Sequence, residues 1–594
     1  MSDIYRQQRE QLVAKNQGHA HLLPETPPQA PQVAPFDLAC ARRVLGPAAN
    51  NHCSLLVVIG WGDGSILRWL ADDPMLVQKD ILMVFLRGEE DAFAASFVRP
   101  QLELIAKLRL QMAVVMGEEQ ARLLASTYFG NHADIPRLAG CEIIDNHPLS
   151  AAGEASRKVL SPQIIKALSD RPQAYGNDIG DSFTGLTHAC KNARALLPAP
   201  TLGELSGFYG NVPIISIAGG PSLTSQIPLL KELQDRCLLV ACDSVLHGLL
   251  AQGIEPHFVT PIERLPSTVD MVRNAGGCRT VFAGSFVVPP EAVQPFAERT
   301  IGVYAWDQLY PWLLPDPGRR VNTGSSTGVF SFAVGSALTT GPVWLVGHDL
   351  AREAGNSHWA GSPLSSELWK KAKSTVDDRS SALTGLETRH VPGNNGELVE
   401  ATVWWDRFRT EIANDVEDLR RGGRTVYNVG GHLRRGALIP GTVAAPLPSP
   451  DSLPRLAAPP MPARNPQRLR QWQDRARRLP EDASTFLRHM TRMREEVAAT
   501  RMQPARDWQI DDLAKKVTLT AEISPGNHAA FFYILRSALH NSSAEWHIRR
   551  RRSGSTARYR WEALNTMDSL CHALHNAVTA LVPTLEEIVR DHCD

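Results

Sequence analysis

Two regions of the chain repeat the order of elements that parallel α/β sheets produce. The first begins at the apolar run 55–59, which leads into Gly60-Trp-Gly-Asp-Gly64, a helix-like stretch at 65–72 and a second apolar run at 81–86. Strands buried on both faces of a parallel sheet carry such continuous apolar runs, and helices connect them. The pattern predicts a smaller N-terminal α/β domain with a Rossmann-like fold.

The second α/β region starts at residue 212 and is longer. Helix-like segments separate several of its apolar runs, which lie at 212–218, 237–242, 257–260, 280–283, 301–304 and 343–346. A parallel sheet with covering helices requires this alternation. We therefore predict a central Rossmann-like domain.

The composition changes sharply after this region. Residues 441–466 are rich in Pro and Ala, and Pro neither extends a helix nor fits inside a sheet, so we predict a linker. Beyond it, apolar residues between Trp561 and Leu581 recur at the i, i+3, i+4 spacing of a packed helix. The predicted organisation is an N-terminal α/β domain at 1–195, a central domain at 196–440, a linker at 441–466 and an all-α domain at 467–594.

Charge and cysteine content narrow the class of protein. Lys plus Arg and Asp plus Glu both number 62, so no overall field favours a nucleic-acid partner. Nine cysteines without a C-x-x-C pair indicate neither a disulfide framework nor a zinc site. The N-terminus lacks an apolar signal core, and Asp243 and His247 interrupt the best apolar stretch, 237–253. We expect a cytoplasmic protein with no membrane partner.

The first chemical motif is Gly219-Gly220-Pro221-Ser222, between a buried strand and a helix. Glycines allow backbone N–H groups to approach an anion closely, and the following helix start favours a phosphate. Asp243 follows the next strand, 24 residues after Gly219, where an acid often binds a ribose hydroxyl. The alternative is a structural turn with a surface Asp.

The second motif, Asn322-Thr323-Gly324-Ser325, precedes an apolar helix that runs to Leu338. A polar, glycine-containing helix start can bind a phosphate or a base edge. Ser and Thr are also the preferred N-caps, so an ordinary cap cluster is the alternative.

The third motif, Gly347-His348-Asp349, stands at the carboxyl end of the run 343–346, and His358 follows nine residues later. Ligands bind at the carboxyl ends of strands in open α/β sheets. Because the pKa of histidine lies near neutrality, we predict His358 as a general base oriented by Asp349. The alternative for His358 is a solvated loop residue.

These motifs, in this order, resemble the Maf/MptE-like domain of motility-associated factor (Maf) flagellin glycosyltransferases. The ending Asn428-Val-Gly-Gly431, followed by Ile439-Pro-Gly441, resembles that family as well. The resemblance covers about 200–441, and Gly60–Gly64 is similar to the companion N-terminal domain of Maf proteins. Two positions depart from the family pattern: His348 replaces the usual Gln, and Glu263 stands near the place of a common Asp.

The resemblance implies a glycosyltransferase that moves a nonulosonic acid, pseudaminic or legionaminic acid, from its CMP-activated form to Ser or Thr of flagellin. Such an enzyme serves flagellar assembly and motility. The domain is also similar to bacterial CMP-sialyltransferases, whose corresponding loops hold CMP. No D-x-D triplet occurs, and a CMP-sugar carries a single phosphate, so we predict no metal site and no cofactor besides the donor. A need for a divalent ion is left open.

Three other functions are compatible with parts of this pattern. Archaeal relatives of the domain are pterin pyrophosphokinases that use ATP and Mg²⁺, but they are much shorter. Gly60–Gly64 could bind S-adenosylmethionine, although Glu89 comes later than the acid that methyltransferases place after the second strand. A non-catalytic flagellin-binding protein is the third alternative.

The C-terminal region carries two arginine-rich stretches, Arg464–Arg478 and Arg549–Arg552, the second with Trp546, Tyr559 and Trp561 nearby. Arg and aromatic side chains dominate protein interfaces. We therefore predict that this helical region recognises flagellin. The alternative is a solvated charged face.

Overall fold

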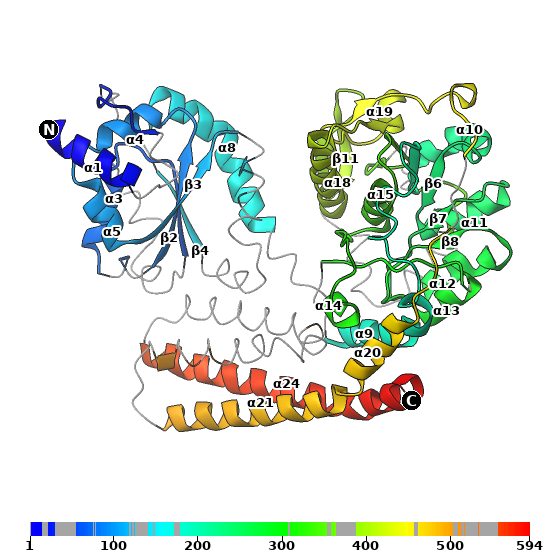
Figure 1. The fold of residues 1–594 in the computed structure, drawn as a ribbon. Coiled ribbons are helices and arrows are strands. Elements are labelled where there is room, and N and C mark those ends of the chain that lie inside the picture. Colours follow the sequence, from blue (N-terminus) through cyan, green and yellow to red (C-terminus); the bar gives the residue numbers. More distant parts are fainter. Residues whose placement is uncertain are drawn as a thin grey trace. The chain divides into compact units, whose positions relative to one another are not determined.

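The computed structural model describes most of the chain (Figure 1). The described residues are 2–14, 22–29, 55–117 without 75 and 78, 120, 121, 124, 141–170 without 147–148, 179–352 without 297 and 307–308, 358–363, 388–456, 461–502, 509, 510, 513, 516, 533 and 556–593. Contacts divide the chain into two compact units. Unit 1 comprises 1–179, 485–524 and 535–580, and unit 2 comprises 180–484, 525–534 and 581–594.

Unit 1 is built on a four-stranded sheet in the order β3-β2-β1-β4, in which every pair of neighbours is parallel. The strands are β1 (Leu55–Ile59), β2 (Asp80–Leu86), β3 (Arg109–Val115) and β4 (Cys141–Asp145). All five residues of β1 are buried, as expected for a strand covered on both faces. The predicted N-terminal α/β fold is confirmed.

Within residues 1–179 of unit 1, the described helices surround this sheet or precede it (Figure 1). They are α1 (Ser2–Ala14), α3 (Ile66–Asp72), α4 (Glu90–Ser96), α5 (Gln101–Lys107) and α8 (Ala151–Asp170). The amide of Gln8 donates to the carbonyls of Phe97 and Arg99, both at 2.7 Å, and so fixes α1 to the loop before α5.

Unit 2 contains a seven-stranded sheet in the order β13-β12-β9-β5-β6-β7-β8, again with parallel neighbours throughout. Its strands are β5 (Ile214–Ile217), β6 (Leu238–Ala241), β7 (Phe258–Val259), β8 (Val281–Phe282), β9 (Val343–Val346), β12 (Val426–Asn428) and β13 (Val443–Ala444). The chain builds the sheet outward from β5 on one side and then returns to add β9 on the other. The strand order therefore reverses between β5 and β9.

Five of the six apolar runs predicted for this region contain strands, and the run 301–304 does not. Gly302 forms only an isolated bridge to Thr201. Ile301, Val303 and Tyr304 are nevertheless buried. An apolar run indicates burial, whereas a strand also requires a series of hydrogen bonds to a neighbouring strand.

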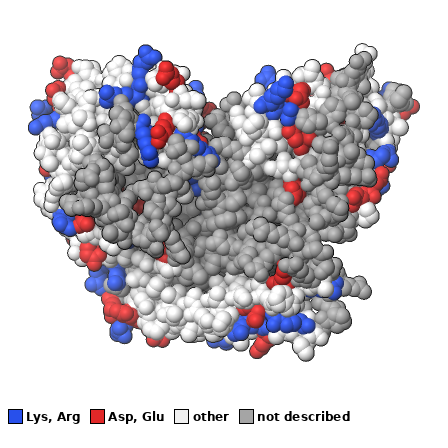
Figure 2. Space-filling model, turned by 180° about the vertical axis from the view of Figure 1, so that it is seen from behind, with Lys and Arg blue, Asp and Glu red and all other residues white. Residues whose placement is uncertain are grey.

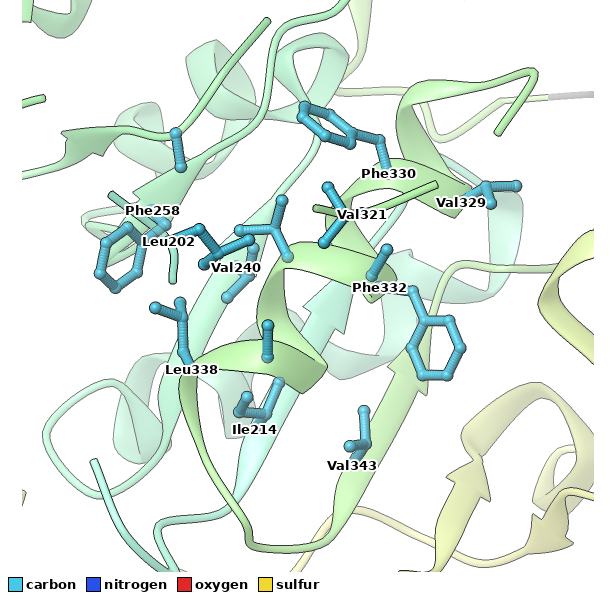
Figure 3. Packing of buried hydrophobic residues seen from close by; sticks show 14 of the residues in the cluster. Leu202, Ile214, Val240, Phe258, Val321, Val329, Phe330, Phe332, Leu338 and Val343 are labelled. Atoms are coloured by element: carbon cyan, nitrogen blue, oxygen red, sulfur yellow. The ribbon is translucent and has the colours of Figure 1, made fainter. Parts of the chain in front are cut away.

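Helix α15 (Thr327–Leu338) lies at the centre of the main core of unit 2, and every residue from Val329 to Leu338 is buried. It packs on β5 and β6, with α18 (Val403–Arg421) beside it. Figure 3 shows Val329 and Phe330 at one end of this helix and Leu338 at the other, beside Ile214. A helix that is apolar on all sides is stable only when it is enclosed in this way.

The remaining elements of unit 2 connect or cover the strands. They are α9 (Ile179–Leu196), η4 (Pro221–Gln226), α10 (Ile227–Leu233), α11 (Asp243–Ala251), α12 (Ser267–Val272), η5 (Arg273–Gly277), α13 (Pro290–Val293), η6 (Gln294–Phe296), α14 (Leu309–Leu313), α19 (Val429–His432), η8 (Pro450–Ser452) and an antiparallel hairpin of β10 (Thr388–Pro392) and β11 (Leu398–Thr402). None of the described helices is long and apolar enough to cross a bilayer.

The Pro-rich segment 441–466 lies against unit 2 through most of its described length. It supplies β13, Leu447 is buried in the core, and the Trp344 indole donates to the carbonyl of Pro446 at 3.0 Å. Asn465 donates its N–H to Pro198 at 2.7 Å. Proline excludes helix and central strand from this segment, but it does not prevent packing at an edge.

The C-terminal region is helical, as predicted, in α20 (Gln467–Ala476), α21 (Leu479–Arg501) and α24 (Thr556–Cys593). The predicted stripe on α24 is buried at Leu564, Met567, Leu570, Cys571, Leu574, Val578 and Leu581. Trp561, which we placed on that stripe, is 66% exposed. On the face shown in Figure 2, positive and negative side chains of the described residues are interspersed, as the balanced composition implies.

Candidate functional site

Two of the three chemical motifs meet at the reversal point of the seven-stranded sheet. Gly219–Ser222 follows β5, and Gly347–Asp349 follows β9, its hydrogen-bonded neighbour. Open α/β sheets bind ligands outside the carboxyl ends of their strands at such a point, because the connections there diverge to opposite faces. This end of the sheet is the candidate site.

Asp349 joins the two loops. Its buried carboxylate accepts the N–H of Ser222 at 2.7 Å, and Gly220 donates its N–H to the carbonyl of Gly347 at 2.8 Å. A Cβ atom at Gly220 would lie 2.5 Å from both the Asp349 carboxylate and the Gly347 carbonyl. Gly220 is therefore required by the close approach of the β9 loop.

The segment between the Asn428–Gly431 motif and Gly441 also contacts Asp349. Ala437 donates its N–H to the Asp349 carbonyl at 2.7 Å. Gly436 has a φ of 73°, and a Cβ atom there would lie 2.6 Å from the same carbonyl. Leu350 has a left-handed φ of 48°, which is costly for a residue other than glycine. These contacts hold Asp349 as the anchor of three loops.

Two hydrogen-bond donors of the Gly219–Ser222 loop remain for a ligand within the part of the chain that the structure describes. Gly219 is partly exposed, and its N–H has no acceptor there. The hydroxyl of Ser222 is buried and has no partner there either. The N–H groups of Gly220 and Ser222, which we expected to hold a phosphate, already donate to Gly347 and Asp349. Pro221 begins η4 and carries no N–H.

The predicted base, His358, lies beside Gly219. Trp359 donates its N–H to the Gly219 carbonyl at 2.7 Å, and a Cβ atom at Gly219 would lie 3.7 Å from Cδ2 of His358. The buried Trp359 ring packs so closely on Gly248 of α11 that a Cβ atom there would be 2.6 Å away. The His358 segment is therefore docked on the loop. Orientation of His358 by Asp349 remains a prediction.

Asp243 is buried at the first position of α11, at the end of β6. Burial raises the pKa of its carboxyl group to about 7; the Ser244 N–H opposes this shift, and the charge of Glu263 adds to it. A hydrogen bond with the Thr327 side chain also lowers this pKa. Thr327 is the first residue of α15, so Asp243 is linked to the second motif.

The second motif forms a turn that is tied to α18. The exposed Asn322 accepts the N–H of Gly324 at 3.0 Å through Oδ1. Ser325 donates its N–H and its hydroxyl to the carboxylate of Glu411, at 2.9 and 2.8 Å. Ser325 therefore already has a carboxylate partner, and Thr323 is partly exposed. Glu411 lies 86 residues away, and no sequence motif pointed to it.

His348 belongs to a buried polar network. Its Nε2 atom lies 3.1 Å from the Ser216 hydroxyl, which lies 3.0 Å from the Ser331 hydroxyl of α15. Burial lowers the pKa of His348 to about 4, and the bond to Ser216 opposes the shift. The imidazole is therefore neutral near pH 7. It joins β9 to β5 and α15 through these hydrogen bonds.

The glycine-rich loop of unit 1 is filled by the protein itself. Gly60, Gly62 and Gly64 all have positive φ angles, between 63° and 94°. The buried Glu89 accepts the N–H groups of Trp61 and Gly62 at 2.6 and 3.0 Å through one carboxylate oxygen, and that of Leu86 at 2.8 Å through the other. Glu89, which we considered too late in sequence, therefore reaches back into the loop. These contacts give S-adenosylmethionine binding no support.

Comparison with known families identifies the central domain. Residues 187–355 match the family model described as 6-hydroxymethylpterin diphosphokinase MptE-like. These residues form an MptE-like domain. The domain contains the loops of Gly219–Ser222, Asp243, Asn322–Gly328 and Asp349, whereas His358 lies just beyond its matched end.

A solved structure extends the likeness beyond the MptE-like domain. The structure of a MAf glycosyltransferase from Magnetospirillum magneticum AMB-1 matches 99% of this chain and 89% of that chain, with a TM-score of 0.58 and 15% sequence identity. At this identity the likeness concerns the fold. No curated protein is similar to the chain in sequence. Among the described residues, no group of three or more His, Cys, Asp or Glu side chains is placed to hold a metal ion.

Proposed function

We propose that this protein is a glycosyltransferase that moves a nonulosonic acid, of the pseudaminic or legionaminic type, from its CMP-activated donor to Ser or Thr of flagellin. The observation that carries the proposal is the meeting of the Gly219–Ser222 and Gly347–Asp349 loops at the reversal point of the sheet. Support comes from the Maf-type fold over the whole chain, and the choice of donor and acceptor rests on the motif resemblance.

The proposed reaction is a direct displacement at the anomeric carbon. The acceptor hydroxyl oxygen bonds to that carbon as the bond to the CMP phosphate oxygen breaks, and CMP leaves with the electron pair. The Gly219 N–H and the Ser222 hydroxyl would donate to the departing phosphate, where preorganised donors are worth most in a water-poor site. His358, docked on Gly219, would accept the proton of the hydroxyl.

The nucleoside would extend from this phosphate position toward the second motif. Asp243 and Asn322 are assigned to the ribose and the base, with Thr327 joining Asp243 to the start of α15. No metal is assigned to the reaction, because a donor with a single phosphate needs no bridging ion. Flagellin and the CMP-sugar are the proposed partners, and nucleic acid and membrane are not.

A second candidate function follows from the description of the matched family, which names a pterin diphosphokinase. That activity would require ATP with Mg²⁺ at the same end of the sheet. Nucleotide titration separates the two, because a ligand at 100 times its Kd stabilises the folded state by about 2.7 kcal/mol. We expect CMP to raise the unfolding temperature and ATP with Mg²⁺ to leave it unchanged. The reverse result would favour the diphosphokinase.

The direct test is the mass of flagellin after incubation with the protein and a CMP-nonulosonic acid. We expect a mass increase equal to one or more sugar residues, with release of an equal amount of CMP. Flagellin of unchanged mass, under conditions in which CMP binds, would contradict the proposed acceptor.

A further inference from the structure

Trp306 exposes a large aromatic side chain next to the second motif. It is 70% exposed, although burial of an indole ring is strongly favourable. The backbone N–H of Trp306 donates to the carbonyl of Val321 at 3.3 Å, and Val321 directly precedes Asn322. Ala305 and Val321 form a parallel bridge, which fixes the two chain segments side by side. Trp306 therefore lies beside the residue that opens the motif.

Arg320 holds the indole ring in place. Its guanidinium carbon lies 5.4 Å from the ring centroid, within the range of a cation–π contact. The same guanidinium donates to the carbonyl of Pro315 at 2.9 Å. The arginine is thus anchored to the backbone while it packs on the ring.

The chain connects this ring to the proposed donor site. Asn322 is five residues before Thr327, so the Cα atoms of Asn322 and Thr327 lie at most about 18 Å apart. The side chain of Thr327 forms a hydrogen bond with Asp243. The Asn322 turn and the tie from Ser325 to Glu411 shorten that path. A nucleoside that runs from Asp243 along the motif would bring its base toward Trp306.

We propose that Trp306 is the stacking platform for the nucleobase of the donor and that Asn322 selects cytosine over uracil. This inference rests on the proposed function. Every base has a π-face that can stack on an aromatic ring, and the contact is worth about 1–3 kcal/mol. The Oδ1 atom of Asn322 is engaged with Gly324, which leaves the NH₂ group as donor. Cytosine offers acceptors at N3 and O2, whereas uracil carries a hydrogen at N3.

The test measures binding of CMP and UMP to the full-length protein by calorimetry. For Trp306→Ala we expect CMP affinity to fall about 5- to 150-fold, the loss of one stacked base, and for Trp306→Phe a smaller fall. The matched control is Trp561→Ala, because Trp561 is 66% exposed but lies on α24. That variant should bind CMP like the wild type.

A second arm tests the selection of the base. Asn322→Asp keeps an oxygen for the Gly324 N–H and replaces the NH₂ donor with an acceptor, so it should reduce the preference for CMP over UMP. The inference is overturned if wild type binds CMP and Trp306→Ala binds it equally well. It is also overturned if Trp306→Ala loses only flagellin modification, because the ring would then contact the acceptor. Failure of the wild type to bind CMP would contradict the proposed function itself.

Discussion

Gly219 and Gly220 are neighbours with different reasons to be glycine. A Cβ atom at Gly219 would make ordinary contacts of 3.5 to 3.7 Å with Val245, Ser244 and His358, whereas one at Gly220 would lie 2.5 Å from the carboxylate of Asp349. We assign the first position to the proposed donor site, whereas the second packs against the protein. Substitution at the two glycines should therefore affect different properties.

We predict that Gly219→Val folds normally but binds CMP at least about tenfold more weakly, because the side chain blocks approach to the free N–H. Gly220→Ala should lower the free energy of unfolding by about 1–3 kcal/mol through overpacking against Asp349. Calorimetry and urea denaturation measure the two effects. Unchanged CMP affinity in Gly219→Val would remove the loop from the donor site.

The proposed role of His358 as general base can be tested by substitution. We predict that His358→Ala retains CMP binding but modifies flagellin about 10²- to 10⁴-fold more slowly, the usual contribution of a general base. His247→Ala is the control, because His247 is an exposed histidine on α11 whose ring nitrogen contacts Asn274. Near-normal turnover in His358→Ala would identify this histidine as a solvated loop residue.

At the scale of the element, the His348–Ser216–Ser331 network joins β9, β5 and α15. The folded pKa of His348, about 4, lies below its ordinary value of 6.5. Between these values the unfolded state binds more protons, so the stability that His348 contributes is present above pH 6.5 and is lost as pH falls toward 4. Asp243 has the opposite slope, because its raised pKa, about 7, costs stability as pH rises from 3.8.

We predict that His348→Gln abolishes the loss of stability that protonation of this histidine causes as pH falls. Over the full interval this loss amounts to about 3 kcal/mol. Glutamine is the residue that the resembled family usually carries there, and it can still bond to Ser216. Urea denaturation of both proteins at pH 7 and pH 5 measures the contribution of His348, because Asp243 is present in both proteins and its effect cancels. Equal pH dependence in the two proteins would show that His348 does not titrate with unfolding.

The apolar pattern predicts the central strands of the sheet in unit 2 but not the two strands at one of its edges. The predicted runs at 212–218 and 343–346 contain β5 and β9, because a parallel strand that is buried on both faces carries a continuous apolar sequence. The short strands β12 and β13 at the edge were not predicted from apolar pattern, because Tyr427 is partly exposed and both residues of β13 are exposed. Their place is set by pairing with β9 and with each other.

At the scale of the whole molecule, the structure divides the predicted docking arginines into two groups. Arg464 donates to the carbonyl of Ala195, Arg468 to that of Ala199 at 2.9 Å, and Arg475 to that of Trp312 at 3.0 Å. These three hold α20 and the segment before it on unit 2. Arg470 and Arg478 are exposed. The run Arg549–Arg552 lies outside the described residues.

We predict that serine at all four positions of Arg549–Arg552 leaves CMP binding unchanged and weakens capture and glycosylation of flagellin. The control replaces Arg470 and Arg478, which are exposed arginines of the first stretch. This full-length comparison is preferable to truncation near Pro440, which would also remove β13 and the buried Leu447 from unit 2. If only the control variant loses flagellin binding, acceptor recognition belongs to the first stretch.

The sequence by itself determined the α/β class, the strands that carry long apolar runs, and the loops that bear Gly219, Asn322 and Asp349, because these features are local. Only the tertiary structure decided which groups in those loops are available. The Asp349 carboxylate accepts the N–H of Ser222, and the Glu411 carboxylate accepts that of Ser325. In unit 1 the Glu89 carboxylate accepts an N–H group of the glycine-rich loop. Each of these partners is remote in sequence or faces its loop only after folding, since a hydrogen bond depends on distance in space.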